Sequence, residues 1–333
     1  MNNENLLEIQ NLCQYFPVTK GVFKRKVGDV KAVDDVSLTV RKGETLGIVG
    51  ESGCGKTTMG RCIVRLNKPT GGHIYFRGED GKHQDIFKLN KQDSFHLRKK
   101  IQIVFQDPYA SLNPTKNIFT AFDEPLKLHG ISSREERYAI ASKMMETVNL
   151  SPQYLERYPH EFSGGQRQRI CIAKALAMNP ELIVCDEPVS ALDVSIQAQI
   201  MNLMRKLQKE YNLTYLFIAH DLSVVKYMSD RIAVMYLGKV VELAESTEIV
   251  ENCEHPYTKA LMSAVPIPKL GAKKEKILLT GDVPSPLNPP SGCRFHPRCS
   301  QCMEICREKE PELREMPGRP GHYCACHLLD QPK

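Results

Sequence analysis

The sequence FSGGQRQR at residues 162–169 lies between two other motifs, and the three together decide the fold. Before it comes GESGCGKT at residues 50–57, and after it comes the apolar run LIVC at residues 182–185, followed directly by Asp186 and Glu187. A glycine-rich loop of this kind indicates only that a nucleoside triphosphate is bound. A Ser-Gly-Gly-Gln segment between that loop and a strand tipped with Asp and Glu is much more specific.

The loop at residues 50–57 has the chemistry of a phosphate cradle. Residues 46–49 (LGIV) predict a short buried strand before it, and the glycines allow backbone N–H groups to turn inward around phosphate oxygens. Lys56 can reach the β- and γ-phosphates, Thr57 can ligate Mg²⁺, and a helix that starts here presents its positive end to the anion. The predicted ATP-binding residues of the loop are Gly50, Ser52, Gly53, Cys54, Gly55, Lys56, Thr57 and Thr58.

Two carboxylates follow the apolar run at the end of a predicted strand, where α/β folds place groups that contact ligands. Asp186 is predicted to hold the hydration shell of Mg²⁺. Glu187 is placed to polarise the water that attacks the γ-phosphate, although a glutamate here could also be a solvated residue that follows a strand. If Glu187 acts on water, the chain hydrolyses ATP and does not only bind it.

The three motifs, in this order, resemble the ATP-binding subunits of ABC transporters, in which ATP is bound between two chains. The resemblance covers roughly residues 5–265. It implies an α/β phosphate-loop NTPase, an ABC ATPase, with a mainly parallel core sheet, a β-rich N-terminal subdomain and a helical subdomain insert at about residues 114–180. We therefore expect an ABC ATPase domain at residues 1–265 and a small Cys-rich C-terminal extension at residues 266–333.

The resemblance also gives roles to polar residues whose positions alone are ambiguous. Gln106 and His220 each end a predicted strand, and such residues are more often surface or core residues than ligands. By resemblance, Gln106 is the lid glutamine that contacts Mg²⁺ or the attacking water. His220 is then the switch histidine that hydrogen-bonds the γ-phosphate and orients Glu187. The expected catalytic residues are Glu187, His220 and Gln106, and the expected Mg²⁺ ligands are Thr57, Gln106 and Asp186.

A second chain completes the site in the resembling family. Ser163 and Gly165 of one chain would close over the γ-phosphate on the other, and Asp193 matches the loop that crosses the dimer interface. The residues expected to act in trans are Ser163, Gly164, Gly165 and Gln166. The partner is either a second copy of this chain or a different ATPase.

Adenine needs a flat partner, and stacking of a base on an aromatic ring contributes about 1–3 kcal/mol. Tyr15 and Phe16 are adjacent aromatic residues after the strand-like residues 6–9. We predict that Phe16 stacks on the base, with Tyr15 as the second candidate. A core position for either ring is the alternative.

Composition limits the class of protein. At 333 residues the chain can form one large α/β domain with an appendage, and it has no apolar run of the roughly eighteen residues that predict a membrane span. Cysteines are scattered before residue 260, and Cys54 lies inside the phosphate loop, so a reducing cytosol is expected. The formal charge of +6 is mild and favours a solvated surface; no nucleic-acid partner is expected.

The coarse periodicity places helices in and after the insert. Residues 114–180 lack strand signals, and the helix that follows the Ser-Gly-Gly-Gln segment is apolar nearly all round, so it should be buried. Later strands alternate with helices, which is typical of a parallel sheet. Helices are predicted at residues 134–148, 166–178, 194–211 and 222–229.

Past residue 265 the composition changes. Prolines at positions 266, 268, 284, 286, 289 and 290 predict a stiff, loop-rich linker, and six cysteines follow within residues 293–326. Three local sequences resemble the ATPases of oligopeptide and dipeptide importers. They are CRFHPRC at residues 293–299, HPYTKAL at residues 255–261 and FQDPYASLNP at residues 105–114.

Such a density of cysteines in a reduced compartment indicates a metal rather than disulfides. Members of the resembling group can carry a [4Fe–4S] cluster on four cysteines of the extension. Carried over position by position, the iron–sulfur ligands are Cys293, Cys299, Cys306 and Cys326, which leaves Cys302 and Cys324 as extras. Four thiolates suit iron–sulfur and zinc alike, so zinc and the absence of any metal are the alternatives.

Together these features predict the ATP-binding and ATP-hydrolysing subunit of an ABC importer for di- or oligopeptides, peripheral on the cytoplasmic face of the cell membrane. The expected cofactors are ATP, Mg²⁺ and the [4Fe–4S] cluster. The expected partners are a second ABC ATPase subunit, two membrane-spanning permease subunits and an extracellular or periplasmic substrate-binding protein. The alternatives are a soluble ABC ATPase without membrane subunits, an importer of nickel complexes or another small solute, and a cysteine module that senses redox state or iron.

Overall fold

The computed structural model describes residues 5–21, 23, 25–78, 81–264 and 276–330, which form two compact units. The first unit contains Arg41–Gly43 and Lys88–Ile218. The second unit contains the other described residues, including those of the C-terminal extension. The expected domain boundary at residue 265 and the prolines at 266 and 268 lie outside the described residues.

Three parallel strands form the centre of the first unit: β6 (Ile101–Val104), β7 (Leu182–Asp186) and β8 (Thr214–Ile218). All residues of β7 and β8 are buried, which explains their continuous apolar sequence. In the ladder Val104 pairs with Cys185, and Asp186 pairs with Ile218. The carboxyl ends of the strands therefore meet at one edge, as parallel pairing requires.

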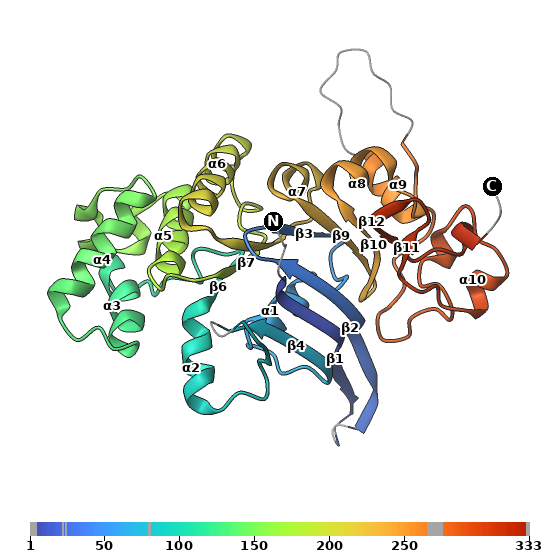
Figure 1. The fold of residues 1–333 in the computed structure, drawn as a ribbon, viewed down its shortest axis with the longest axis horizontal. Helices are drawn as coiled ribbons and strands as arrows, with labels where there is room; N and C mark the ends of the chain where they lie inside the picture. Colours follow the sequence, from blue (N-terminus) through green and yellow to red (C-terminus); the bar gives the residue numbers. More distant parts are fainter. Residues whose placement is uncertain (1–4, 22, 24, 79–80, 265–275, 331–333) are drawn as a thin grey trace, which may run out of the picture. The chain divides into compact units, whose positions relative to one another are not determined.

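Helices and the loops between them make up most of the rest of the first unit. The segment from residue 114 to residue 180 is described throughout and contains no strand, and its helices lie together in the green part of Figure 1. Asn117, Ser133 and Ser163 cap three of these helices by accepting a hydrogen bond from a backbone N–H group. The helices of the unit are α2 (Lys91–Lys100), α3 (Ile118–Leu128), α4 (Arg134–Thr147), η1 (Pro152–Glu156), η2 (Pro159–Glu161), α5 (Gly164–Leu176) and α6 (Val194–Tyr211).

One sheet of the second unit comes from the N-terminal part of the chain, as the strand-rich sequence predicts. Its strand order is β2-β1-β4-β5, and the antiparallel pair β1 and β4 places Leu7 opposite Phe76. Figure 1 shows β1, β2 and β4 side by side. The strands are β1 (Asn5–Lys20), β2 (Arg25–Arg41), β4 (Gly71–Arg77) and β5 (His83–Asp85).

The other strands of the second unit follow the order β11-β12-β10-β9-β3. The pair β3 and β9 is parallel, as expected for the core, whereas the pairs β9–β10, β10–β12 and β11–β12 are antiparallel. Two strands of the extension thus continue this sheet, so the extension is not only loop. The strands are β3 (Thr45–Val49), β9 (Arg231–Tyr236), β10 (Lys239–Glu245), β11 (Arg314–Met316) and β12 (Arg319–Cys324).

The helices of the second unit are shorter. α7 packs on β3 so closely that a Cβ on Gly47 would lie 2.5 Å from a methyl carbon of Val225, so only glycine fits there. None of the helices in the described ranges combines the length and hydropathy that crossing a membrane requires. The helices are α1 (Lys56–Ile63), α7 (Leu222–Met228), α8 (Ser246–Asn252), α9 (Pro256–Ala264), η3 (His296–Arg298), α10 (Ile305–Glu308) and η4 (His327–Asp330).

Candidate nucleotide site and cysteine cavity

The phosphate loop follows the buried strand β3 and leads into α1, as the sequence predicts. Gly50 and Gly55 have φ angles of 156° and 106°, and both lie against backbone. A Cβ on Gly50 would lie 2.1 Å from the carbonyl oxygen of Met235, and one on Gly55 would lie 2.0 Å from that of Ala32. These two glycines are therefore required by close packing as well as by φ.

Inside the loop, Lys56 is buried and its ammonium group is held by the loop itself. Its Nζ donates to the carbonyl oxygens of Gly50 at 2.7 Å and Glu51 at 3.1 Å. Cys54 is buried, with its sulfur 3.7 Å from the same Nζ, and burial raises the pKa of the Cys54 thiol. The Cys54 side chain therefore points inward, and its backbone N–H donates to the Glu51 carbonyl oxygen at 3.2 Å.

The outer turn of the loop is open. Ser52 and Gly53 are exposed, and Thr57 and Thr58 are half-buried in the first turn of α1. A backbone that presents N–H groups here, next to a helix N-terminus, is suited to anions.

The two aromatic candidates for adenine have different surroundings in the second unit. Phe16 is 40 % exposed, so its ring is accessible to a base. The Tyr15 hydroxyl donates to the Asp34 carboxylate, and burial together with this bond raises the pKa of Tyr15. Burial alone would raise the pKa of Asp34, but the Tyr15 bond and the charge of Arg294 hold it below its usual value. Tyr15 is thus engaged in the fold, whereas Phe16 is accessible.

His220 is exposed and directly follows Ala219, whose N–H donates to the carbonyl oxygen of Ile48 at 3.1 Å. His220 therefore follows a residue that is hydrogen-bonded to β3, near the end of β3 that leads into the phosphate loop. The sequence predicts that His220 ends a strand, and β8 ends two residues before it, at Ile218.

In the first unit, the structure brings Gln106 and Glu187 together. Gln106 lies two residues beyond β6, and its Nε2 donates to Glu187 Oε2 at 3.0 Å. Glu187 has a left-handed backbone with φ of 48°, and its N–H donates to the carbonyl oxygen of Ile218 at 2.9 Å. Asp186, the last residue of β7, is 3 % exposed. The buried carboxylate of Asp186 is thus next in sequence to the half-buried carboxylate of Glu187, which Gln106 orients.

The Ser-Gly-Gly-Gln segment starts α5 with a reciprocal cap. Ser163 Oγ accepts from the Gln166 N–H at 3.3 Å, and Gln166 Oε1 accepts from the Ser163 N–H at 3.0 Å. A Cβ on Gly165 would lie 2.6 Å from Cγ2 of Ile196 in α6, and one on Gly164 would lie 3.3 Å from a methyl carbon of Leu192. The two glycines therefore allow the N-termini of α5 and α6 to pack closely.

Asp193 caps α6 in the same region. Its Oδ1 accepts from the Ser195 hydroxyl at 2.7 Å and from the Ile196 N–H at 3.0 Å, and these bonds hold the pKa of Asp193 below its usual value. Asp193 is exposed while it caps the helix.

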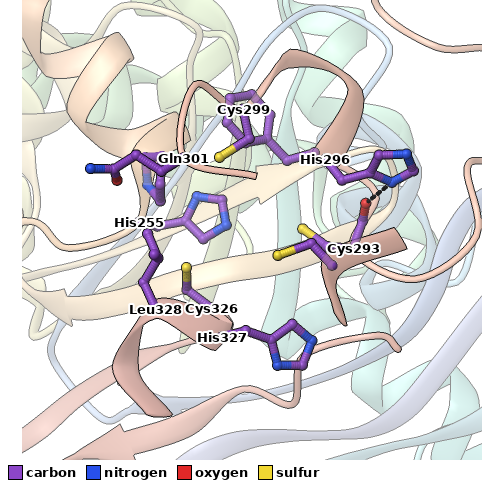
Figure 2. A pocket seen from close by; sticks show the side chains of 11 residues that line it. His255, Cys293, His296, Cys299, Gln301, Cys326, His327 and Leu328 are labelled. Atoms are coloured by element: carbon purple, nitrogen blue, oxygen red, sulfur yellow. Dashed lines mark hydrogen bonds between the residues drawn. The ribbon is translucent and has the colours of Figure 1, made fainter. Parts of the chain in front are cut away.

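The C-terminal extension contains a cavity lined by cysteines (Figure 2). It spans about 300 Å³, including space open to solvent. Figure 2 shows Cys293, Cys299 and Cys326 with their side chains directed toward a common space, and Cys326 comes from a different segment than the other two. The cysteines among the lining residues are Cys293, Cys299, Cys306 and Cys326, and Cys302 and Cys324 are not among them.

The thiols of the cavity are close enough to influence one another. Burial raises the pKa of Cys293 to about 12, and the other three cavity cysteines contribute in the same direction. Burial likewise raises the pKa of Cys326 to about 11. Each deprotonated thiol disfavours the next because like charges repel, so a cation at this place would lower the pKa values of Cys293 and Cys326.

The histidines at the cavity have partners of their own. His255 Nδ1 accepts from the Tyr257 N–H at 3.1 Å, His296 Nδ1 lies 3.0 Å from the carbonyl oxygen of Cys293, and His327 Nε2 lies 2.9 Å from that of Lys309.

Two arginines next to cysteines of the cavity were not predicted as functional residues. Arg298 forms an ion pair with Glu51 of the phosphate loop, and Arg294 forms one with Asp34. The signal was present, because CRFHPRC places an arginine next to each of its cysteines. Nothing in the sequence, however, indicates the partners.

Comparisons with known proteins agree with this geometry. Residues 33–190 match the ABC transporter family, and residues 241–306 match the oligopeptide/dipeptide transporter C-terminal region. The chain is 55 % identical to the oligopeptide transport ATP-binding protein AppF of Bacillus subtilis, with 98 % of each chain covered. It is 49 % identical to the dipeptide transport ATP-binding protein DppF of Haemophilus influenzae, again over 98 % of each.

Among solved structures, the chain resembles the ATP-binding cassette MJ0796, seen as a dimer in a post-hydrolysis state bound to ADP and Pi. The TM-score is 0.61 at 31 % identity, with 72 % of this chain and 98 % of that chain covered. The fold, the motifs and the near full-length similarity lead to one assignment. The chain belongs to the ABC transporter family, to the group of ATP-binding proteins that carry the oligopeptide/dipeptide transporter C-terminal region.

Proposed function

We propose that this protein binds and hydrolyses ATP to energise the uptake of di- or oligopeptides by an ABC importer. The observation that carries the proposal is the similarity, over 98 % of both chains, to an oligopeptide transport ATP-binding protein. The geometry of each unit supports the chemistry that the proposal requires.

ATP binding is assigned to the second unit. The loop with Lys56 receives the phosphates, and the accessible ring of Phe16 stacks on adenine, because a glycine-rich turn at a helix N-terminus suits anions and a flat ring suits a base. On ATP binding, Lys56 Nζ exchanges the carbonyl oxygens of Gly50 and Glu51 for phosphate oxygens. His220 hydrogen-bonds the γ-phosphate in this proposal.

Hydrolysis is assigned to the first unit. Glu187 accepts a proton from the attacking water, and Gln106, which donates to the Glu187 carboxylate at 3.0 Å, keeps that carboxylate oriented. Gln106 and Asp186 belong to this unit and Thr57 to the second unit. Each offers oxygen ligands, the kind of donor that Mg²⁺ prefers. When bound, Mg²⁺ would neutralise phosphate charge.

The proposed working form is a dimer of two ATPase chains. Ser163 and Gly165, at the N-terminus of α5, would face the γ-phosphate held by the partner chain, where backbone N–H groups and the positive helix end favour an anion. Asp193, exposed at the start of α6, would contribute to the same interface. The dimeric state of the cassette MJ0796 supports this arrangement.

The remaining partners follow from the family. Two membrane-spanning permease subunits would carry the peptide path, and a substrate-binding protein outside the membrane would deliver the peptide. The chain would then be peripheral, on the cytoplasmic face of the membrane.

The donor chemistry of the cysteine cavity fits an iron–sulfur cluster. Four thiols line it, and a set of four thiolates suits iron–sulfur and zinc alike. We propose a [4Fe–4S] cluster on Cys293, Cys299, Cys306 and Cys326, which would brace the extension.

The transport function is tested by uptake of a labelled tripeptide into cells. Deletion of the gene should abolish uptake, the wild-type gene should restore it, and a Glu187→Gln gene should not. Uptake of a free amino acid serves as the control. Normal tripeptide uptake in the deletion strain, or failure of the protein to co-purify with any membrane subunit in detergent, would contradict the proposal.

A further inference from the structure

A turn of the C-terminal extension, residues 293–299, contacts both the cysteine cavity and the phosphate loop. Its end residues, Cys293 and Cys299, line the cavity (Figure 2). The turn is tight, because the His296 N–H donates to the Cys293 carbonyl at 3.0 Å and the Cys299 N–H donates to the His296 carbonyl at 3.3 Å. The backbone that places the thiols therefore also fixes the residues between them.

Arg298 reaches from this turn to the phosphate loop. Its Nη1 donates to Glu51 Oε2 at 2.8 Å, and its Nη2 donates to Glu51 Oε1 at 3.2 Å. The Arg298 side chain is 8 % exposed and the Glu51 side chain 27 %, so water screens the pair only in part. A two-pronged contact of this kind fixes the orientation of the carboxylate as well as its position.

Glu51 is in turn connected to the lysine of the loop. Its N–H donates to the Tyr257 hydroxyl at 2.9 Å, and its carbonyl oxygen accepts from Lys56 Nζ at 3.1 Å and from the Cys54 N–H at 3.2 Å. A displacement of Glu51 would therefore move the backbone around Lys56.

Two other residues of the turn, Phe295 and Arg294, also hold it in place. Phe295 is 2 % exposed and packs on the rings of Tyr236 and Tyr257, with ring centroids 5.3 and 5.4 Å apart. Arg294 pairs with Asp34, which also accepts from the Tyr15 hydroxyl. The turn is thus held in place by the packing of Phe295 and by the ion pairs of Arg294 and Arg298.

We propose that Arg298 is a positioning residue for ATP, which holds the first turn of the phosphate loop through Glu51 and so links the cysteine cavity to nucleotide affinity. The proposal rests on the proposed function, in which the loop at residues 50–57 binds the phosphates. Coupling between two sites is reciprocal, so bound nucleotide should also stabilise the turn at residues 293–299.

Affinity of the full chain for AMP-PNP with Mg²⁺ tests the proposal. Arg298→Gln and Glu51→Gln should each weaken binding about fivefold or more, and the double variant should be no weaker than the poorer single variant, because both remove one interaction. Arg314→Gln is the matched control, since Arg314 pairs with Asp330 in the same extension but both side chains are nearly half exposed. It should bind AMP-PNP like the wild type.

A second readout is independent of affinity. AMP-PNP should slow hydrogen exchange in residues 293–299 of the wild type, and Arg298→Gln should lose that slowing. Affinity of folded Arg298→Gln within about twofold of the wild type would overturn the proposal, as would additive losses in the double variant.

Different results would contradict the positioning role of Arg298 and the proposed function. If Arg298→Gln does not fold, Glu51→Gln decides alone, since it leaves every side chain of the extension unchanged; unaltered affinity would then overturn the positioning role. If the wild type itself does not bind AMP-PNP, the proposed function is wrong.

Discussion

Glu187→Gln separates the chemical step of ATP hydrolysis from the stability of the fold. Glutamine has the length of glutamate, and its side-chain oxygen can accept the hydrogen bond that Gln106 Nε2 donates at 3.0 Å. The bond from the Glu187 N–H to the Ile218 carbonyl, at 2.9 Å, belongs to the backbone and is unaffected. The substitution therefore removes a charge and a proton acceptor and little else.

The loss of stability that Glu187→Gln causes can be compared with the loss of turnover. The left-handed φ of 48° at Glu187 costs a residue with a side chain about 1–2 kcal/mol, but glutamine bears the same cost and it cancels. Exchanging a charged acceptor for a neutral one costs about 1 kcal/mol, and less here because Gln106 is exposed. Loss of a placed general base costs about 10²–10⁴-fold in rate, which is about 3–5 kcal/mol in activation free energy. Turnover should fall far more than stability.

The assay is phosphate release at saturating Mg-ATP, with thermal unfolding and AMP-PNP affinity measured on the same preparations. Glu181→Gln is the control, because Glu181 lies just before the other end of β7, where it pairs with Lys100 at 3.1 Å. It should keep turnover near that of the wild type. The assignment is refuted if Glu187→Gln turns over within about threefold of the wild type, or if Glu181→Gln loses as much.

Three further outcomes follow from packing and ligand chemistry. Gly165→Val should cost about 1–3 kcal/mol in urea unfolding, because even its Cβ would lie 2.6 Å from Cγ2 of Ile196; an unchanged midpoint would contradict this packing. After anaerobic reconstitution Cys293→Ser should lack iron and Cys302→Ser should retain it, because only the first lines the cavity; equal iron would be evidence against the ligand set. Glu242→Gln should lose about 1–3 kcal/mol of stability, since its fully buried carboxylate accepts from two backbone N–H groups and a histidine ring, and an unchanged melting temperature would disprove that reasoning.

Much of the candidate site was predictable because its parts are local in sequence or meet by a simple rule of sheet geometry. The loop between β3 and α1 follows from its glycines and Lys56. The helix predicted at residues 194–211 has those bounds in the structure, since Asp193 caps it and Asn212 ends it in a left-handed conformation. Gln106 and Glu187 meet because parallel strands end at the same edge of a sheet.

The strands of the extension could not be predicted from its composition. β12 (Arg319–Cys324) contains a proline and a glycine, and its alternation of polar and apolar residues is weak, so the sequence indicates a loop. It forms a strand because β10 offers an edge, with Glu242 opposite Cys324 and Leu243 opposite Tyr323. Tertiary pairing here overrides local preference.

In this chain, two segments that lie far apart in the sequence can still depend on each other for stability. The extension lies far from the phosphate loop in sequence, and that distance alone predicts that loss of the cysteine site would leave ATP binding intact. Arg298 and Glu51 are nevertheless in contact across 247 positions. Loss of the turn would leave the Glu51 carboxylate without its cation and would uncover the buried rings of Tyr236 and Tyr257. Because these groups belong to the same compact unit as the phosphate loop, the free energy that folds the extension around its thiols also holds that loop in place.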